Sequence, residues 1–215
     1  MTLQTLLNNP NRPEPWHDKR FEHTLHALRE YGLNNTHDVL NFGGWSIFNT
    51  VLEDEVKCNV ENTSHDLRVF QQLPHQYDFA LMMEVIEHLS DEPNIERVAD
   101  WTYTGAVNCL KTARSCCDKL FISTPNVCGL RSLINIIEHK HPHTFQPHTH
   151  EYAPLELQQL VESCGWKVER LWTVDSWGNH GLNGVQTRIA HRLLKVAGAS
   201  TALRKDNIFI IATHK

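Results

Sequence analysis

The most informative pattern in the chain is a short apolar run that leads directly into acidic and imidazole side chains. Residues 79–83 are continuously apolar, and Glu84, Glu87 and His88 follow at once. An apolar run without polar alternation is typical of a strand that helices cover on both faces. If a helix follows, the spacing of i, i+3 and i+4 places the three polar side chains on one face. Open α/β sheets bind ligands at the carboxyl ends of their strands, so we expect a site there.

The rest of the chain alternates between patterns that predict strands and patterns that predict helices. Besides residues 77–83, the strand-like segments are 38–42, 56–60, 120–122, 167–174 and 208–213. The segments with helical spacing or helix end signals are 16–31, 46–52, 84–89, 93–113, 130–137, 154–164 and 189–196. Strands that alternate with helices in this way predict an α/β protein with a mostly parallel sheet.

Two segments fall outside this alternation. Residues 1–15 contain three prolines and no periodic apolar pattern, so we expect an irregular arm. Residues 127–152 combine a short helical pattern with a loop rich in histidine and proline, and we expect them to form a cap or lid over the site. The hydrophobic content of 40% supports a sizeable core. We therefore expect residues 1–215 to form a single domain.

Composition and charge narrow the choice of partners. The chain has 20 basic and 25 acidic residues and a net charge of −5, which favours a small-molecule substrate over nucleic acid. No stretch approaches the roughly 18 apolar residues of a membrane span, and the first residues lack the pattern of a signal peptide. These features predict a cytoplasmic protein without a membrane partner. The six cysteines lack C-x-x-C spacing, which indicates reduced thiols. The sequence leaves the oligomeric state open.

Four motifs, taken in order, resemble those of the class I S-adenosylmethionine-dependent methyltransferases of types 11, 12 and 23. They are DVLNFGG at 38–44, YDFALMMEVIEHL at 77–89, KLFISTPN at 119–126 and HEYAPLELQQLVESCGWKVERL at 150–171. The resemblance covers residues 16–215 and implies a Rossmann-like, doubly wound, mostly parallel sheet of the seven-stranded type with an antiparallel last strand. Only 35 positions (78 − 43) separate Gly43 from Asp78, which predicts a shortened region between the second and third strands.

The resemblance implies that S-adenosylmethionine binds at the loop after the first strand. The residues that it assigns to the cofactor are Asn41, Gly43, Gly44, Asn59, Glu61, Met83 and Glu84. Glycine removes the side chain that would block a ligand, and a carboxylate can accept hydrogen bonds from two vicinal ribose hydroxyls. Three residues depart from the family pattern, because Asn41 and Asn59 stand where an aspartate is common and Trp45 replaces a glycine. Both core packing and adenine stacking stay open for Trp45.

A divalent-cation site is implied by the same resemblance. Glu84, Glu87 and His88, together with the later His148, are similar to the groups with which small-RNA 2′-O-methyltransferases hold a cation beside the acceptor hydroxyl. Magnesium or manganese suits such carboxylate and imidazole ligands. Without a metal, His88, His148 or His150 is the candidate general base, since imidazole titrates near neutral pH. The alternative interpretation of this acidic face is an ordinary solvated surface.

The function predicted from these residues is the transfer of a methyl group from S-adenosylmethionine to an oxygen of a small metabolite or sugar-type acceptor. Two alternatives stay open. The first is a methyltransferase-like, non-catalytic binding or regulatory module, in which the altered NFGGW loop no longer holds the cofactor. The second is a metal-dependent RNA 2′-O-methyltransferase, which requires a basic groove for the nucleic acid.

Overall fold

The chain builds one sheet of six strands among the residues that the structure describes. The structure is a computed structural model, and it describes residues 1–9, 18–44, 46–90, 104–143, 145, 147–176, 189, 192–196 and 202–215. The strands are β1 (Asp38–Asn41), β2 (Asn59–Asn62), β3 (Tyr77–Met83), β4 (Cys117–Pro125), β5 (Trp166–Val174) and β6 (Asn207–His214), in the spatial order β2-β1-β3-β4-β6-β5. β1 to β4 are parallel, and β6 is antiparallel to both of its neighbours. The predicted fold class is confirmed.

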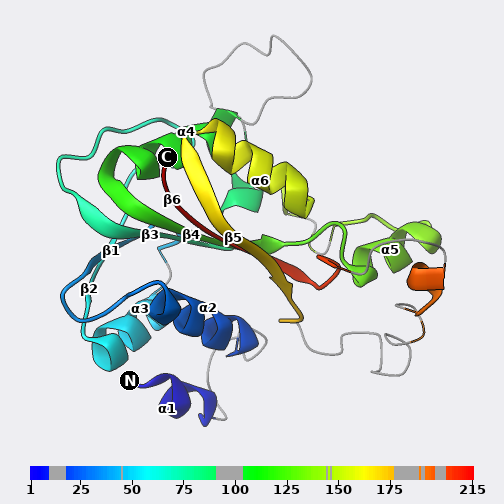
Figure 1. Ribbon diagram of the computed structural model, residues 1–215, viewed down its shortest axis with the longest axis horizontal. Helices are drawn as coiled ribbons and strands as arrows, with labels where there is room; N and C mark the ends of the chain where they lie inside the picture. Colours follow the sequence, from blue (N-terminus) through cyan, green and yellow to red (C-terminus); the bar gives the residue numbers. More distant parts are fainter. Residues whose placement is uncertain are drawn as a thin grey trace.

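Helices cover both faces of this sheet. The helical elements are α1 (Leu3–Leu7), α2 (Asp18–Glu30), α3 (Ser46–Val51), a π-helical turn η2 (Leu52–Val56), a 3-10 turn η3 (Ile86–His88), α4 (Thr104–Cys116), α5 (Leu130–Ile137) and α6 (Pro154–Ser163). In Figure 1, α4 and α6 lie on one face of the sheet, whereas α2 and α3 lie on the other. α5 lies beyond the carboxyl end of β4.

Alternation along the strands explains why the core has two halves. Successive side chains of a strand point to opposite faces, so a strand covered on both sides is apolar throughout. In β3, Ala80 and Met82 pack with the α4 and α6 residues, whereas Phe79 and Leu81 pack with the α2 and α3 residues. The apolar run at 79–83 is therefore the buried centre of the sheet, as its pattern predicted.

The structure corrects three details of the sequence interpretation. The first 15 residues are not wholly irregular, because Thr2 caps the short helix α1 and Leu6 is buried. The second strand starts at Asn59 rather than Val56, since Val56 belongs to η2 and Lys57 ends that turn in the left-handed conformation (φ 68°). The helix expected from residue 93 starts at Thr104 within the described residues, and residues 91–103 lie outside them.

Other boundaries agree closely with the prediction. α5 spans residues 130–137 as expected, and residues 189 and 192–196 are helical. No strand lies between Asn62 and Tyr77, all of which are described, so the shortening between the second and third strands is present. All six cysteines are free, and none of the described helices has the length and apolar character needed to cross a membrane.

Candidate functional site

The loop after β1 is held by a chain of side-chain amides. Asn41 is buried, and its Oδ1 accepts a hydrogen bond from the Gly43 N–H (2.9 Å). Its Nδ2 donates to Asn49 Oδ1 (2.7 Å), and Asn49 Nδ2 donates in turn to Asn62 Oδ1 (2.8 Å). An ionised aspartate could only accept at this position, whereas Asn41 both accepts and donates. The amide at position 41, where the resemblance predicts an aspartate, thus has a structural reason.

Replacing Asn41 with alanine tests this network. The change leaves the Gly43 N–H and the buried Asn49 amide without the partner that each has now. Because an unsatisfied buried polar group costs about 1–3 kcal/mol, we expect the free energy of unfolding to fall by roughly that amount in a urea titration. Asn34→Ala is the matched control, since Asn34 is an exposed amide that also bonds its own loop. A loss no larger than that of the control contradicts the assignment.

Gly43 and Gly44 bring the loop against the residues that follow β3. A Cβ atom on Gly43 would lie 3.0 Å from Val85 Cγ2 and 3.5 Å from the Met83 carbonyl oxygen, so the two segments pack tightly. Gly44 has a φ of +60°, and an added Cβ would meet nothing within 4 Å. The loop is therefore anchored through Gly43 and open at Gly44, on the side where a ligand can approach the backbone.

The two predicted ribose contacts lie in different places. Asn59 begins β2, at the amino end of the parallel strands, and its amide donates to Asp38 Oδ1 (3.2 Å). Glu61 lies closer to the loop and accepts from the Tyr77 hydroxyl (2.8 Å). Asn62, which the sequence interpretation missed, pairs with Asn41 in the sheet register. The structure thus brings Glu61 and Asn62 to the loop edge and leaves Asn59 at the opposite edge.

Glu84 does not continue into a helix with Glu87 and His88. Its φ is +55°, so the backbone turns at this residue, and only Ile86–His88 form a 3-10 turn. The expectation that Glu84, Glu87 and His88 share one face of a helix over 84–89 is therefore wrong. The turn directs the Glu84 carboxylate toward α2, β4 and β6, and it accepts from Ser123 Oγ of β4 (3.0 Å) and from Asn207 Nδ2 of β6 (2.8 Å).

Arg20 completes the surroundings of Glu84. This arginine comes from α2, its side chain is 1% exposed, and one guanidinium nitrogen lies 2.7 Å from Glu84 Oε2. Burial raises the pKa of Glu84, and the Arg20 charge lowers it. The sequence interpretation did not single out Arg20. Its only signal was a charged residue on the apolar face of an amphipathic helix, one position before Phe21.

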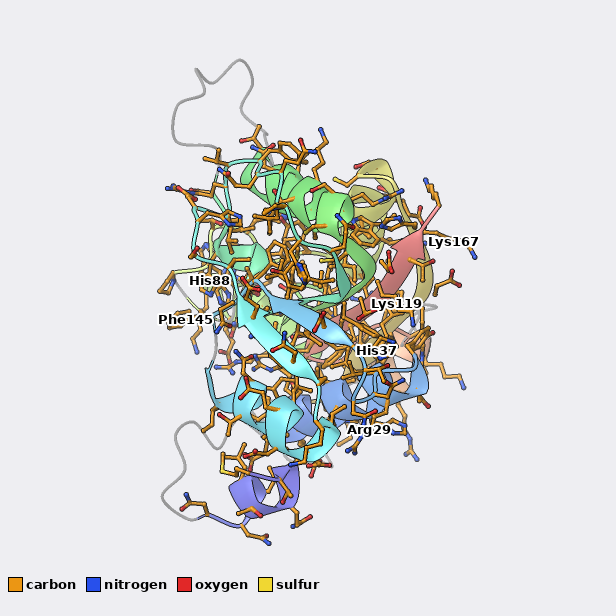
Figure 2. The ribbon with its side chains drawn as sticks, turned by 90° about the vertical axis from the view of Figure 1, so that its left-hand side faces the viewer. Arg29, His37, His88, Lys119, Phe145 and Lys167 are labelled. Carbon is orange, nitrogen blue, oxygen red and sulfur yellow. The ribbon has the colours of Figure 1, made fainter. Side chains whose placement is uncertain are left out.

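Glu87, His88 and His148 form a compact group at the carboxyl edge of the sheet. One potential ligand atom from each residue lies within 4.8 Å of the others. The rings of His88 and His148 meet edge to face, with centroids 4.7 Å apart. Glu84, which the resemblance added to the cation ligands, is not in this group. Figure 2 shows His88 on the same side of the molecule as Phe145, opposite His37, Lys119 and Lys167 at the amino ends of the strands.

Backbone hydrogen bonds hold His148 beside Glu87. The Glu87 carbonyl oxygen accepts from the N–H of Thr149 (2.8 Å), the N–H of His150 (3.2 Å) and the Thr149 hydroxyl (2.9 Å). Farther along, Tyr152 pairs with Asn126 at the end of β4. The HEY motif thus runs alongside the turn after β3, which joins segments 61 positions apart (148 − 87).

Two further carboxylates orient the histidines of this segment. Glu151, which is buried, lies 2.6 Å from His148 Nδ1 through its Oε1 atom. A proton on Nδ1 leaves the His148 Nε2 lone pair available for a ligand. Glu156 lies 2.9 Å from His150 Nε2 and also accepts from the Ala153 N–H at the start of α6. His150 is thus bonded to a helix N-terminus, and its catalytic role stays a prediction.

The electrostatics of the group suit a divalent cation. Burial and the nearby Glu84 charge raise the pKa of Glu87 well above its usual range. Thr124 donates to Glu87 Oε2 (2.8 Å), whereas the buried Oε1 has no hydrogen-bond partner among the described residues. Burial and the neighbouring His148 lower the pKa of His88, which favours the neutral imidazole that a metal needs. An oxygen and two imidazole nitrogens form a donor set that manganese accepts readily.

Comparisons with known proteins identify the fold. No protein-family model matches the chain, and no curated protein matches it. Among solved structures, a SAM-dependent methyltransferase from Archaeoglobus fulgidus matches with a TM-score of 0.53 and 16% identity, over 90% of this chain and 94% of that one. The small RNA methyltransferase HEN1 matches with a TM-score of 0.57 and 16% identity, over 94% of this chain and 26% of that one.

A third match extends the range of chemistry within this fold. A cyclopropane-fatty-acyl-phospholipid synthase-like protein from Lactobacillus casei matches with a TM-score of 0.56 and 10% identity, over 98% of both chains. The chain therefore has the Rossmann-like fold of the S-adenosylmethionine-dependent methyltransferases, as the resemblance predicted. Because the matched proteins differ in substrate, the fold leaves the acceptor open.

Proposed function

We propose that this protein is an S-adenosylmethionine-dependent methyltransferase that methylates a hydroxyl oxygen beside a divalent cation. The observation that carries the proposal is the group of Glu87, His88 and His148, which lies at the sheet edge where the loop of Gly43 and Gly44 also ends. In doubly wound sheets, ligands bind at this edge. A cofactor loop and a candidate cation site thus adjoin one another.

The cofactor side of the proposal uses residues of three strand ends. Gly43 and Gly44 lie against the methionine part of S-adenosylmethionine, and Met83 forms the wall beneath it. Glu61 or Asn62, at the end of β2, binds the ribose hydroxyls. The amide network around Asn41 holds the start of the loop in place. Side-chain hydrogen bonds of Asn41 thus fix the start of the altered loop as far as Gly43, and Trp45 lies outside the described residues.

The catalytic side rests on alignment and on the removal of one proton. The sulfonium is already reactive, so placing the acceptor oxygen in line with the methyl group supplies most of the rate. Manganese or magnesium bound by Glu87, His88 and His148 would lower the pKa of the acceptor hydroxyl. Glu151 keeps His148 in one tautomer, and Thr124 holds Glu87 through its Oε2 atom. If no cation binds, His88 is the exposed imidazole that can accept the proton.

The proposed acceptor is a sugar-type hydroxyl, whether on a small metabolite or at the end of an RNA. Two observations together support the RNA hydroxyl: the group of Glu87, His88 and His148, and the backbone likeness to the small RNA methyltransferase HEN1. The net charge of −5 favours the small molecule. Transfer of a radioactive methyl group to nucleosides and sugars, compared with transfer to short single-stranded RNA, separates the two acceptors.

Calorimetric titration with S-adenosylmethionine and S-adenosylhomocysteine tests the cofactor part of the proposal. We expect saturable binding of both, and we expect Gly44→Val to weaken it, because the new side chain fills the open side of the loop. At about 1 mM cofactor, only ligands with a dissociation constant well above that concentration fail to bind. If neither heat nor a thermal shift is seen there, the non-catalytic module is favoured instead.

Replacing Glu151 with glutamine tests how His148 is oriented. The variant keeps the shape of the side chain but removes the charge that fixes the His148 tautomer. Loss of such an outer partner typically costs about 10–100-fold in metal affinity, so we expect manganese binding, followed by electron paramagnetic resonance, to weaken by that factor. Glu156→Gln, which changes the partner of His150, is the matched control and should leave manganese affinity unchanged.

A further inference from the structure

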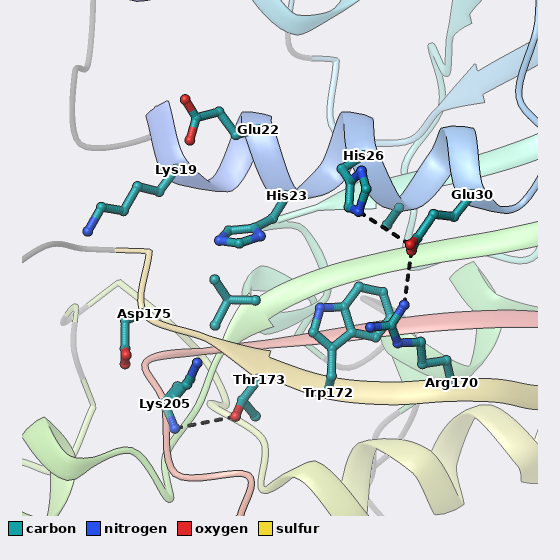
Figure 3. Close-up of a pocket in the computed structure, with 12 residues that line it drawn as sticks. Lys19, Glu22, His23, His26, Glu30, Arg170, Trp172, Thr173, Asp175 and Lys205 are labelled. Atoms are coloured by element: carbon teal, nitrogen blue, oxygen red, sulfur yellow. Dashed lines mark hydrogen bonds and ion pairs between the residues drawn. The ribbon is translucent and has the colours of Figure 1, made fainter.

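A pocket lies between α2 and the edge strand β5. Its volume is about 490 Å³, which falls within the range of small-molecule sites. Figure 3 shows α2 along one side of it and the end of β5 along the other. None of the residues predicted for the cofactor, the cation or catalysis lines this pocket. It is therefore separate from the candidate active site.

One face of α2 packs into the protein core, and another face lines the pocket. Phe21, Leu25 and Leu28 pack into the core, and Arg20 reaches Glu84. The pocket is lined by the other face of the helix, with Lys19, His23, His26, Ala27 and Glu30. Lys19, His23, His26 and Glu30 are separated by four, three and four positions, which places them on one helical face, and the buried Ala27 lies beside that face. A helix face rich in charged and imidazole side chains thus faces the edge strand β5 across the pocket.

The β5 side of the pocket supplies a fixed aromatic surface. The Trp172 indole stacks on Phe209, with ring centroids 5.5 Å apart and an interplanar angle of 29°. The Arg170 guanidinium lies 4.6 Å from the indole centroid and 3.0 Å from Glu30 of α2. These contacts hold the half-buried Trp172 in one orientation, with Ala27 and Val174 as further apolar lining. A ligand therefore meets a preformed surface made by the Trp172 indole and the Arg170 guanidinium over it.

The other end of the pocket is lined by two positively charged side chains, Lys19 and Lys205. Among the described residues, neither the Lys19 nor the Lys205 amine forms an ion pair with a carboxylate. Figure 3 shows the Lys205 amine directed toward α2, whereas Glu22 points away from β5 and Asp175 points away from α2. Burial lowers the pKa of His23. The Glu22 charge raises this pKa, whereas the charges of Lys205 and Lys19 lower it further. Both amines thus act on the His23 imidazole, and the negative charge of a bound anion would favour uptake of a proton from solvent by that ring.

We propose that this pocket binds a small organic anion with an aromatic body, distinct from the methyl donor and its acceptor. The anionic group lies among Lys19, His23 and Lys205, and the aromatic body lies against Trp172. A carboxylate and a phosphate can both supply the charge. The chemistry therefore includes aromatic carboxylates and nucleoside phosphates, which the experiment separates.

The test is a calorimetric titration with 2-naphthoate and with adenosine 5′-phosphate, in the presence of saturating S-adenosylhomocysteine. Uncharged adenosine serves as the matched probe for the phosphate. We expect at least one anion to bind with a dissociation constant below about 1 mM, and adenosine to bind at least about tenfold more weakly. The pKa of the His23 ring, followed by NMR, should rise on binding, because an added negative charge stabilises the imidazolium.

Matched variants locate the site. Lys19→Met/Lys205→Met should weaken anion binding about tenfold, whereas Lys140→Met/Lys167→Met removes the same charge from exposed ion pairs elsewhere and should leave it unchanged. The proposal is overturned if neither anion binds at about 5 mM, if both double variants bind equally, or if adenosine binds as tightly as its phosphate. Should S-adenosylhomocysteine fail to bind, the methyltransferase proposal is lost, but the pocket titration keeps its meaning, since no residue is shared.

Discussion

Replacing Arg20 with methionine is expected to lower the free energy of unfolding by about 3 kcal/mol. Removing one partner of a buried ion pair typically costs about 3–5 kcal/mol, because the other charge stays buried and uncompensated. Glu84 is 12% exposed and keeps its hydrogen bonds from Ser123 and Asn207, so we expect the lower end of that range. Urea denaturation at pH 7 measures the loss.

The pH dependence of this loss identifies its cause. Arg20 lowers the pKa of Glu84, so the variant raises that pKa further. A carboxyl whose folded pKa is raised binds its proton more tightly in the folded state, and stability then falls as pH rises from the unfolded pKa through the folded one. The defect of Arg20→Met should therefore be small at low pH and grow toward neutral pH.

Two further variants separate the charge effect from packing. Arg20→Met/Glu84→Gln removes both charges and should recover much of the stability. Arg29→Met removes another arginine of the same helix, which forms an ion pair with Glu55 and whose side chain is 46% exposed. This change should lower the free energy of unfolding by about 1 kcal/mol or less. If Arg20→Met is no worse than Arg29→Met, or if its defect does not change with pH, the buried pair does not have the role assigned to it.

The elements that the sequence predicted well are those with a local cause. β3 spans the apolar run that led the interpretation, and α5 has the predicted bounds. In both, the spacing of apolar side chains matches the faces that the fold buries. α1 was missed because it covers only five residues, too few for a periodic pattern, before a proline-containing segment. The turn at Glu84 was missed because a glutamate carries no preference for positive φ.

The candidate site was only partly predictable because its geometry depends on distant segments. Sequence spacing placed Glu87 beside His88, and the resemblance supplied His148. Nothing in the local pattern indicated that Glu84 would turn toward Arg20 or that Glu151 would orient His148. Those contacts form only when α2 and the HEY segment pack around β3 and β4. The division of two neighbouring glutamates between an ion pair and a candidate cation site is thus a property of the tertiary structure.

Loss of manganese binding in His148→Ala is the second large expected effect. The variant removes one of three ligand atoms that lie within 4.8 Å of one another. Changes in outer partners alone cost about 10–100-fold, so removal of a ligand should weaken manganese binding by at least about 100-fold. Electron paramagnetic resonance of added manganese measures the affinity directly and needs no knowledge of the acceptor.

Controls distinguish a lost ligand from a disturbed loop. His141→Ala removes an exposed histidine from the same loop and should leave manganese affinity unchanged. S-adenosylhomocysteine affinity should also persist in His148→Ala, because neither the Asn41 hydrogen bonds nor the Gly43 contacts involve His148. Glu87→Gln should match His148→Ala, since it neutralises the only carboxylate in the group. Equal manganese affinity in wild type and in both site variants rules out the cation site and leaves His88 as the candidate base.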